Sequence, residues 1–297
     1  SGADTGYGLY LNGSAELVQG NRIGSDGTGT SAIPNSVGVY VFGSTGALIG
    51  GTAAGAGNLI SGNQNFGVQV SSAPAMLIQG NRIGTRPDGL TALPNSLGIY
   101  LSSAATVGGV AAGAGNILAR NASDGVAVAG GVGSVIRGNS IFGNGGLGID
   151  LSDNGRSPND LNDSDAGPNL TQNFPVLIAA TISGGNLFVT YSVNSDPGNA
   201  AYPLTVDFYE SDLLGQGRVY LGTNTYTAAD FTVGAKIVNL GNAGGLGVVQ
   251  PGPLVAVPTD IPEPGKAGYA EAVRDLTERA VLCADGRSFV LFTAYSL

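Results

Sequence analysis

The stretch GNRIG at residues 20–24 occurs a second time, residue for residue, at residues 80–84, so the two copies lie 60 positions apart. Similarity at a fixed period is typical of arrays of stacked structural units. The sequence around the two copies keeps nearly the same step, because PNS at 34–36 returns at 94–96, GVYV at 38–41 returns as GIYL at 98–101, and GAGN at 55–58 returns at 113–116.

A shorter period lies inside the long one, because a Gly-apolar-x-apolar pattern recurs at roughly half that interval, at Gly8, Gly38, Gly67, Gly98, Gly125 and Gly148. Alternation of this kind predicts a strand with one buried face. A second strand type precedes Gly-Asn, as at residues 17–19, 77–79 and 135–137. Since no unit contains a long stretch of helical periodicity, helical solenoids are disfavoured and the repeats predict a parallel β-helix.

The Gly-Asn pairs are expected at the corners between these strands. Glycine reaches positive φ or allows close backbone approach, and asparagine tolerates left-handed conformations. In stacked coils, equivalent asparagines can also bond one another in a ladder. We predict such a ladder, with plain turn residues as the alternative, at Asn21, Asn58, Asn81, Asn116 and Asn139.

The composition limits the classes of partner. Charged residues make up 11% of the chain and the net charge is −9, which argues against nonspecific binding to nucleic acid or to anionic membranes. No apolar run approaches the length that a membrane-spanning helix needs, so membrane insertion is not expected. The sequence starts at Ser1 within an apparent partial coil and ends at Leu297 after a β-rich run. We therefore expect a fragment, in which the lack of a targeting segment carries little information.

Charge and strand spacing divide the chain into four parts. Residues 1–150 form the predicted β-helix, and residues 151–174 form an acidic, Asn- and Asp-rich connecting loop. In residues 175–257, closely spaced short strands, with no helix between them and a Gly184-Gly185 hairpin, predict a small immunoglobulin-like sandwich. Residues 258–297 read as a helix at 269–280 followed by a strand at 288–293, a pattern foreign to everything upstream.

Two family resemblances add to this interpretation. The segments GNRIGSDGTGTSAIPNSVGVYV, GNGGLGIDLSDNG, NDSDAGPN, QNFPVL and YLGTNTYTAADFTVGAKIVNLGNA resemble bacterial secreted or surface proteins with right-handed parallel β-helix repeats, often of the CSLREA type. This resemblance covers residues 1 to about 255, although the CSLREA region itself is missing. It implies an all-β chain in which a right-handed β-helix precedes a sandwich, and an extracellular or cell-surface location.

The second resemblance covers only residues 257–297. This segment is similar to a piece of DinG-like helicases of the XPD type, where a helix precedes an LVLFTSY-like strand, here VLFTAY at 290–295. Ala294 replaces the usual serine, and no upstream GxxxxGK[ST] loop supplies a phosphate site. The resemblance therefore implies a fused or misassembled helicase piece without ATPase activity.

Catalytic residues are not predicted. A β-helix can host polysaccharide lyases or glycoside hydrolases, but the chain has no histidine and its coils hold few carboxylates. Asp26 and Asp88 share a turn position and could lie about 10 Å apart, within the range for glycoside hydrolysis. We interpret them as solvated turn residues, and we expect the equivalent Arg22 and Arg82 to be exposed, with stacked stems.

The acidic loop is the best candidate metal site. Ca²⁺ takes six to eight oxygen ligands in irregular geometry, and oxygen-bearing side chains alternate before Gly167 at Asp160, Asn162, Asp163 and Asp165. A structural Ca²⁺ ion is the only cofactor expected, and a solvated linker is the alternative.

An outward aromatic column is the candidate contact surface. Tyr10, Tyr40 and Tyr100 occupy matching positions in the Gly-x-Tyr-x strands, where they could stack on sugar rings, bind a surface protein or shield the sheet. We therefore expect a non-enzymatic extracellular scaffold of an adhesive or glycan-contacting kind. A carbohydrate-active enzyme is the alternative.

Overall fold

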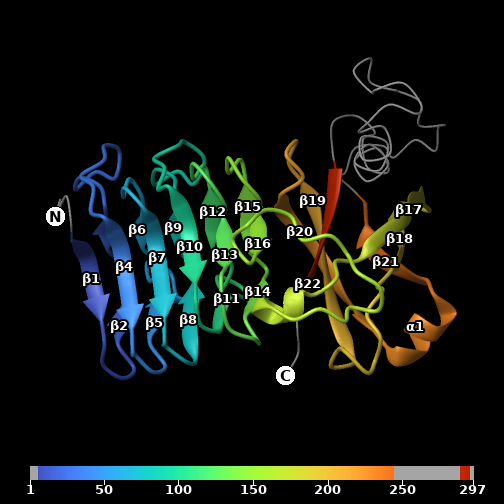
Figure 1. Ribbon diagram of the computed structural model, residues 1–297. Helices are drawn as coiled ribbons and strands as arrows, with labels where there is room; N and C mark the ends of the chain where they lie inside the picture. The colour runs from blue at the N-terminus through green and yellow to red at the C-terminus, as the bar shows by residue number, and fades with distance from the viewer. Residues whose placement is uncertain (1–5, 244–287, 295–297) are drawn as a thin grey trace, which may run out of the picture.

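The computed structural model describes residues 6–243 and the backbone of residues 288–294. Three parallel sheets run along the first half of the chain, and each turn of the chain adds one strand to each sheet (Figure 1). This is the predicted parallel β-helix. Sheet 1 contains β1 (Tyr7–Leu11), β4 (Val37–Phe42), β7 (Phe66–Ser71), β10 (Leu97–Leu101), β13 (Val126–Val128) and β16 (Ile149–Leu151).

The other two sheets are built from shorter strands. Each coil therefore carries three strands, one more than the minimum that the sequence suggested. Sheet 2 contains β2 (Leu17–Val18), β5 (Leu48–Gly50), β8 (Met76–Gln79), β11 (Ala105–Gly108) and β14 (Val135–Arg137). Sheet 3 contains β3 (Arg22–Ile23), β6 (Leu59–Ile60), β9 (Arg82–Ile83), β12 (Ile117–Ala119) and β15 (Ser140–Phe142).

The core of the β-helix consists of aliphatic columns that run along its axis. Strand pairing aligns equivalent residues of successive coils, such as Val39, Val68, Ile99 and Val126. All four side chains are fully buried. Like side chains therefore stack on like side chains, which fills the interior without helices.

The glycine that opens each sheet 1 pattern lets neighbouring coils approach. A Cβ atom on Gly67 would lie 2.7 Å from the carbonyl oxygen of Gly98 and 2.8 Å from Cγ2 of Ile83. Gly67 has no positive φ, so close approach is the reason that this position needs glycine.

Two asparagine ladders bind the coils at their corners. In the first, Nδ2 of Asn21 donates to Oδ1 of Asn58 at 3.1 Å, and Nδ2 of Asn58 donates to Oδ1 of Asn81 at 2.9 Å. The same bond continues to Asn116 and Asn139 at 3.0 and 2.9 Å. The five asparagines named in the sequence therefore hydrogen-bond in one line.

The second ladder was not foreseen. It links Asn35, Asn63, Asn95, Asn121 and Asn144 through Nδ2-to-Oδ1 bonds of 2.9 to 3.1 Å. Buried amides that pair in this way satisfy one another away from water.

Long corner loops alternate from coil to coil. Between sheets 2 and 3, the loops at residues 51–58 and 109–116 are long, whereas the corner at residues 80–81 is tight. Between sheets 3 and 1, the long loops are residues 24–36 and 84–96. Each loop type recurs in every second coil, which explains the longer of the two periods in the sequence.

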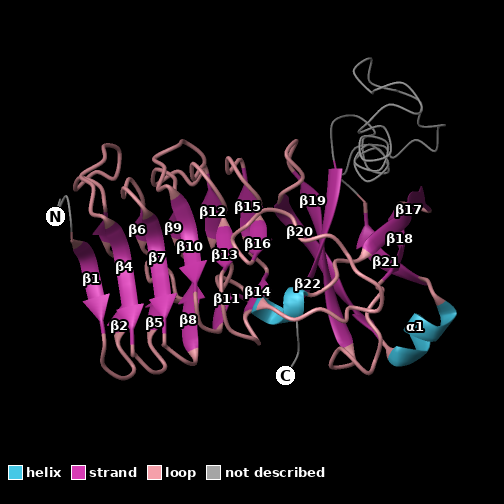
Figure 2. Ribbon diagram, in the orientation of Figure 1, coloured by secondary structure: helices cyan, strands magenta, loops and turns pink. Residues whose placement is uncertain are grey.

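A β-sandwich follows the β-helix (Figures 1 and 2). One antiparallel sheet has the order β17 (Val176–Ser183), β18 (Asn186–Ser192), β21 (Lys236–Asn242). The other has the order β20 (Gly217–Tyr226), β19 (Leu204–Ser211), β22 (Ser288–Ala294). Leu187, Tyr191, Val206, Phe208 and Tyr226 share one core between the two sheets. The all-β fold class, with a β-helix before a sandwich, is confirmed.

The sandwich is held against the last coil of the β-helix by polar contacts. Arg137 forms a bidentate ion pair with buried Asp207, through Nε at 2.8 Å and Nη2 at 2.7 Å. Gln216 occupies the next rung of the second ladder, because its Oε1 accepts from N and Nδ2 of Asn144 at 3.0 and 2.9 Å. The sandwich thus supplies the pairing groups that a further coil would have supplied.

Two details of the sandwich region differ from the sequence interpretation. A short helix, α1 (Ala228–Val233), lies where only strands were expected. Thr227 and Asp230 form a capping box at its start, which satisfies amide groups that would otherwise be free. The connecting loop also contains a short turn, η1 (Pro168–Thr171), in which Asn169, Leu170 and Thr171 have the positive φ of left-handed backbone.

The tail is described only in part. The expected helix at 269–280 and the last residues of the predicted sandwich, up to residue 257, lie outside the described residues. The final strand, β22, pairs antiparallel with β19 from Ser211↔Ser288 to Thr205↔Ala294. The backbone of this segment therefore forms an edge of the sandwich.

Candidate functional site

Among the described residues, the most exposed aromatic side chains lie on the first two strands of sheet 1. We call Tyr7, Tyr10, Tyr40 and Phe42 the aromatic strip. Their ring centroids lie 4.7 to 6.2 Å apart in successive contacts, the range in which aromatic pairs attract. Tyr7, Tyr10 and Phe42 nevertheless keep 49%, 48% and 46% of their surface exposed. The strip can therefore offer ring surface to a flat apolar ligand.

The three tyrosines named in the sequence occupy one column of sheet 1. Tyr10 is paired with Tyr40, Tyr40 with Gln69, and Gln69 with Tyr100. Gln69 separates Tyr100 from the strip, and Tyr100 stacks instead on Phe66 with centroids 4.9 Å apart. The column is thus divided into two aromatic groups.

Sequence reasoning missed three aromatic residues of these groups, namely Tyr7, Phe42 and Phe66. Phe42 was recoverable, because it follows Tyr40 by two positions and residues i and i+2 of a strand share one face. Tyr7 and Phe66 stand at the beginning of their strands, where the repeat calls for an apolar residue, such as the paired Val37 and Leu97, but not for an aromatic one.

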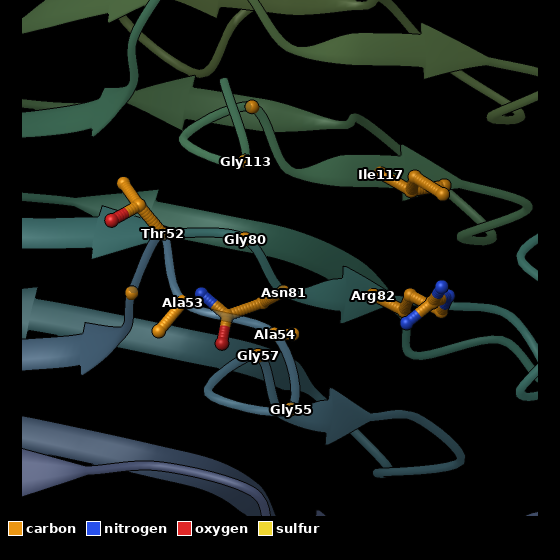
Figure 3. Close-up of a pocket in the computed structure, with 12 residues that line it drawn as sticks. Thr52, Ala53, Ala54, Gly55, Gly57, Gly80, Asn81, Arg82, Gly113 and Ile117 are labelled. Carbon is orange, nitrogen blue, oxygen red and sulfur yellow. The ribbon is translucent and has the colours of Figure 1, made fainter. Parts of the chain in front are cut away.

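A second surface feature lies beside sheet 3, at the corners near Gly80 (Figure 3). The loop at residues 51–58 and the loop at residues 109–116 stand on either side of the tight corner, because a Cβ on Gly80 would lie 2.3 Å from the Gly51 carbonyl oxygen and 3.0 Å from that of Gly113. The hollow there measures about 280 Å³. Arg82 and Ile117 point the same way from neighbouring strands beside it (Figure 3).

An adjoining hollow of about 180 Å³ continues this feature toward the first coil. The two hollows share Gly55, Gly57 and Arg82, and we call them together the arginine groove. Arg22 lines the second hollow. Because Leu59 lies between the two arginines in strand register, their stems do not occupy adjacent strands as direct stacking would require.

The acidic connecting loop brings three of its four predicted ligand residues together. One carboxylate oxygen from each of Asp160, Asp163 and Asp165 lies within 4.8 Å of the others. Asn162 is not part of this cluster. Its backbone carbonyl oxygen accepts hydrogen bonds from the Asp196 amide at 3.0 Å and from Nδ2 of Asn199 at 3.1 Å. The three carboxylates could serve as oxygen ligands of a hard cation.

The environment of this cluster differs from one carboxylate to the next. Burial raises the pKa of Asp163, although hydrogen bonds from Ser195 and the Asn173 amide oppose the shift. Burial also raises the pKa of Asp165, and the Asp160 charge adds to the effect. For Asp160, hydrogen bonds from Ser164 and Asn173 outweigh burial and lower the pKa. Oδ1 of Asp160 and Oε1 of Gln172 are buried without a hydrogen-bond partner.

A second carboxylate cluster, unforeseen from the sequence, lies at the end of the β-helix and contains Asp124, Asp150 and Asp153. Oδ1 of Asp124 accepts from the Leu147 amide, and Asp150 accepts from the Gly155 amide at 2.8 Å. Burial raises the pKa of Asp150. Asp124 thus anchors the backbone of the corresponding corner in the next coil, and Asp150 anchors the loop that follows its own strand.

Asp26 and Asp88, the pair considered for glycoside hydrolysis, each hold their own corner loop. Asp26 accepts from the Thr28 hydroxyl and the Thr30 amide. Asp88 accepts from the Leu90 and Thr91 amides at 2.8 Å. The Thr91 hydroxyl and these amides lower the pKa of Asp88 to about 2. Both carboxylates therefore act as turn residues.

A family comparison agrees with the coiled arrangement of the strands. The family model described as a right handed beta helix region matches residues 3–165. The chain belongs to the right-handed β-helix family. No curated protein and no solved structure matches it. The aromatic strip and the arginine groove both lie inside the part of the β-helix that the family model covers.

The sandwich lies outside the matched residues. None of the helices in the described part of the β-helix protein is long and apolar enough to cross a membrane.

Proposed function

We propose that this β-helix protein is a non-catalytic scaffold of an extracellular or cell-surface bacterial protein, and that its aromatic strip contacts glycans. The observation that carries the proposal is the strip itself: four rings that pack on one another while three of them stay about half exposed. Exposed apolar surface of this kind marks interaction sites.

The scaffold supports the strip mechanically. Tyr10 and Tyr40 stand on paired strands whose inward neighbours, such as Val39 and Val41, are fully buried. Rings held in this way lose little conformational freedom when a ligand binds, and preorganisation lowers the cost of binding. A sugar ring presents an apolar face that suits stacking on such side chains.

The extracellular or cell-surface location rests on the resemblance of the repeats to secreted bacterial proteins. The choice of a scaffold over a carbohydrate-active enzyme rests on the carboxylates. Asp26 and Asp88 each accept hydrogen bonds from their own loops, and the residues that line the arginine groove include no carboxylate.

A glycan array tests the proposal. We expect the wild-type protein to bind a subset of neutral glycans, and the double variant Tyr10→Ala plus Tyr40→Ala to lose that binding. The control is Ile237→Ala, which removes an exposed apolar side chain from the sandwich instead. Equal binding by the wild type and the double variant would refute a role for the strip.

The same glycans also test the enzymatic alternative. Incubation with a polysaccharide panel, followed by assays for new reducing ends and for unsaturated products, should give neither. Products that disappear in Asp88→Ala would favour the enzyme over the scaffold.

A further inference from the structure

Three carboxylates meet in the connecting loop without a neutralising partner. We call Asp160, Asp163 and Asp165 the loop cluster, and one oxygen of each lies within 4.8 Å of the other two. None of the three forms an ion pair with another of the described residues. Asp163 is buried; burial, with the neighbouring charges of Asp160 and Asp165, raises its pKa. Charges of one sign held together away from water are stabilised by a cation.

A buried glutamine beside the cluster also points to a cation. Gln172 is 7% exposed, and its Nε2 donates to Oδ2 of Asp163 and to the Ser195 hydroxyl, both at 2.8 Å. An ionised carboxylate only accepts hydrogen bonds, so this contact fixes the orientation of the amide. Oε1 of Gln172 shares its carbon atom with Nε2 and therefore lies beside the same carboxylate, yet it has no hydrogen-bond partner.

Oδ1 of Asp160 is the second buried oxygen without a hydrogen-bond partner at this place. The other oxygen of Asp160 accepts from the Ser164 amide and hydroxyl at 3.0 and 2.9 Å, so the side chain is held in position while Oδ1 stays unused. Buried polar atoms are nearly always paired with protein, water or an ion. A metal ion is the one partner that would use the free oxygens of Asp160 and Gln172 and also neutralise the cluster.

The oxygen set suits Ca²⁺ better than Mg²⁺. Ca²⁺ takes six to eight oxygen ligands at about 2.3–2.6 Å, so two ligands of one ion lie at most about 5 Å apart. The spacing within the loop cluster stays under this limit. Asp165 is exposed, which leaves room for water at the remaining positions. Mg²⁺ keeps several waters and is usually held by one or two carboxylates, whereas three carboxylates and an amide oxygen converge here.

The loop cluster lies where the connecting loop meets the sandwich. Oδ2 of Asp163 accepts from the Ser195 hydroxyl at 2.6 Å. The backbone carbonyl of Asn162 accepts from the Asp196 amide at 3.0 Å. Ser195 and Asp196 belong to the loop between β18 and β19. The residues that surround the proposed ion therefore come from the connecting loop and contact the sandwich directly.

The same connecting loop is fixed to the β-helix by Asn169. Oδ1 of Asn169 accepts from the Ser134 amide at 2.8 Å, and its Nδ2 donates to the Ser134 carbonyl at 2.7 Å. Its backbone amide donates to the Gly131 carbonyl at 2.9 Å. Gly131 and Ser134 lie in the corner between β13 and β14. The loop thus holds the β-helix at Asn169 and the sandwich at the loop cluster.

We propose that the loop cluster and Gln172 bind one Ca²⁺ ion, and that this ion fixes the sandwich to the β-helix. With the ion bound, the connecting loop holds Ser195 and Ser134 at the same time. Without it, repulsion among the three carboxylates loosens the contact with Ser195. The device does not depend on the proposed function, because the aromatic strip lies on sheet 1 at the opposite end of the β-helix (Figure 1).

Terbium luminescence of the full chain tests the site. Tb³⁺ replaces Ca²⁺ in oxygen sites and emits when an excited aromatic ring close by transfers energy to it. The chain has no tryptophan, and the Tyr202 hydroxyl donates to the Ser195 carbonyl at 2.6 Å. We expect emission on tyrosine excitation that Ca²⁺ displaces and an equal concentration of Mg²⁺ does not. Tyr202→Phe should lower the emission at least twofold and leave Ca²⁺ binding in calorimetry unchanged.

Carboxamide variants identify the ligands by calorimetry with Ca²⁺. Asp165→Asn should weaken binding about tenfold or more, because Ca²⁺ affinity depends on the number of charged ligands. Asp160→Asn plus Asp165→Asn should lose binding. The matched control is Asp153→Asn, which removes an exposed carboxylate from the second carboxylate cluster and should bind like the wild type. Circular dichroism of each variant would show that the fold is retained.

Hydrogen exchange followed by mass spectrometry tests the fixation of the sandwich. Ca²⁺ should slow exchange at least tenfold, relative to EDTA, in peptides that cover residues 160–173 and in peptides that cover residues 194–199. Exchange in β4 and β7 should not change. Slowing confined to residues 160–173 would overturn the role of the ion in holding the sandwich.

Three other results would overturn the site itself. They are no binding of Ca²⁺ by the wild type, equal binding by the Asp160→Asn plus Asp165→Asn variant, and an equal loss in Asp153→Asn, which would move the ion to the second carboxylate cluster. Mg²⁺ that displaces Tb³⁺ as well as Ca²⁺ does would overturn the assignment to Ca²⁺.

Discussion

Replacement of Asn81 by alanine should be among the most destabilising single changes at the corners of the β-helix. Asn81 is 1% exposed and lies in the middle of the first ladder. Its Oδ1 accepts from N and Nδ2 of Asn58 at 3.0 and 2.9 Å. Its Nδ2 donates to Oδ1 of Asn116 at 3.0 Å and to the Ile49 carbonyl at 2.9 Å.

The cost follows from what the alanine leaves behind. The buried amide of Asn58 loses this acceptor, and an unsatisfied buried donor costs about 1–3 kcal/mol. The lost bonds of the Asn81 side chain add about 1 kcal/mol each, so we expect a loss of about 3–5 kcal/mol in the free energy of unfolding. At an m value of about 3 kcal/mol/M, the urea midpoint would fall by about 1 M or more.

Asn21→Ala provides the matched control at the exposed end of the same ladder. The side-chain Nδ2 of Asn21 donates to the Gln19 carbonyl and to Oδ1 of Asn58. In the alanine variant, that Oδ1 keeps the hydrogen bond from the backbone amide of residue 21. We expect a loss of about 0.5–1 kcal/mol. Urea unfolding followed by far-ultraviolet circular dichroism measures both variants. Equal costs, or a cost below about 1 kcal/mol for Asn81→Ala, would refute the view that the ladder stabilises the stack.

Three further outcomes are expected. Arg137→Ala should lower the free energy of unfolding in urea by about 3–5 kcal/mol, because it leaves the buried Asp207 carboxylate unpaired. Lys236→Ala, at the more exposed pair with Asp230, should lower it by under about 1 kcal/mol. Similar losses in the two variants would contradict this reasoning. Asp88 should titrate by NMR at about 2, and Thr91→Val should raise its pKa. Since the folded pKa is depressed, the stability from this group is present above the unfolded pKa near 3.8 and is lost as the pH falls through about 2; an unchanged pKa in Thr91→Val would exclude the hydroxyl as the cause. Structural Ca²⁺ in the acidic loop stays a prediction. The melting temperature of the protein should be higher in Ca²⁺ than in EDTA, because the ion binds the folded state. The Asp163→Ala plus Asp165→Ala variant should melt at the same temperature in both. Identical melting with Ca²⁺ and EDTA in the wild type would end that prediction.

The β-helix was predictable because the side-chain pattern repeats at a fixed interval, and only stacked coils of strands satisfy that pattern. Alternation at Val39-Tyr40-Val41 fixes which face is buried, and the return of the pattern in the next coil fixes the stacking. The residues of the first ladder were recognisable because each follows a glycine at a corner.

The second ladder was harder to recognise, because Asn35 and Asn95 follow proline and Asn121 follows arginine. No single dipeptide marks this ladder, and only the strand register shows that the five corners coincide. The start of α1 was recoverable from Thr227 and Asp230, which are spaced as in a capping box.

The arginine groove could not be derived from one coil. Arg22 and Arg82 were recognised as equivalent positions, but the walls beside them come from loops that belong to other coils. Their enclosure depends on Gly113 approaching Thr52, which belongs to a loop two coils earlier. Such a contact is set by the packing of successive coils and has no local signature.

The alternation of long and short corners makes a pair of coils, rather than a single coil, the smallest segment that can be duplicated or deleted without altering the surface. Removing a single coil would keep the inward aliphatic columns continuous, yet it would place two overhanging loops on neighbouring turns, where they would collide. Changes in the length of this array during evolution should therefore occur in whole steps of two coils.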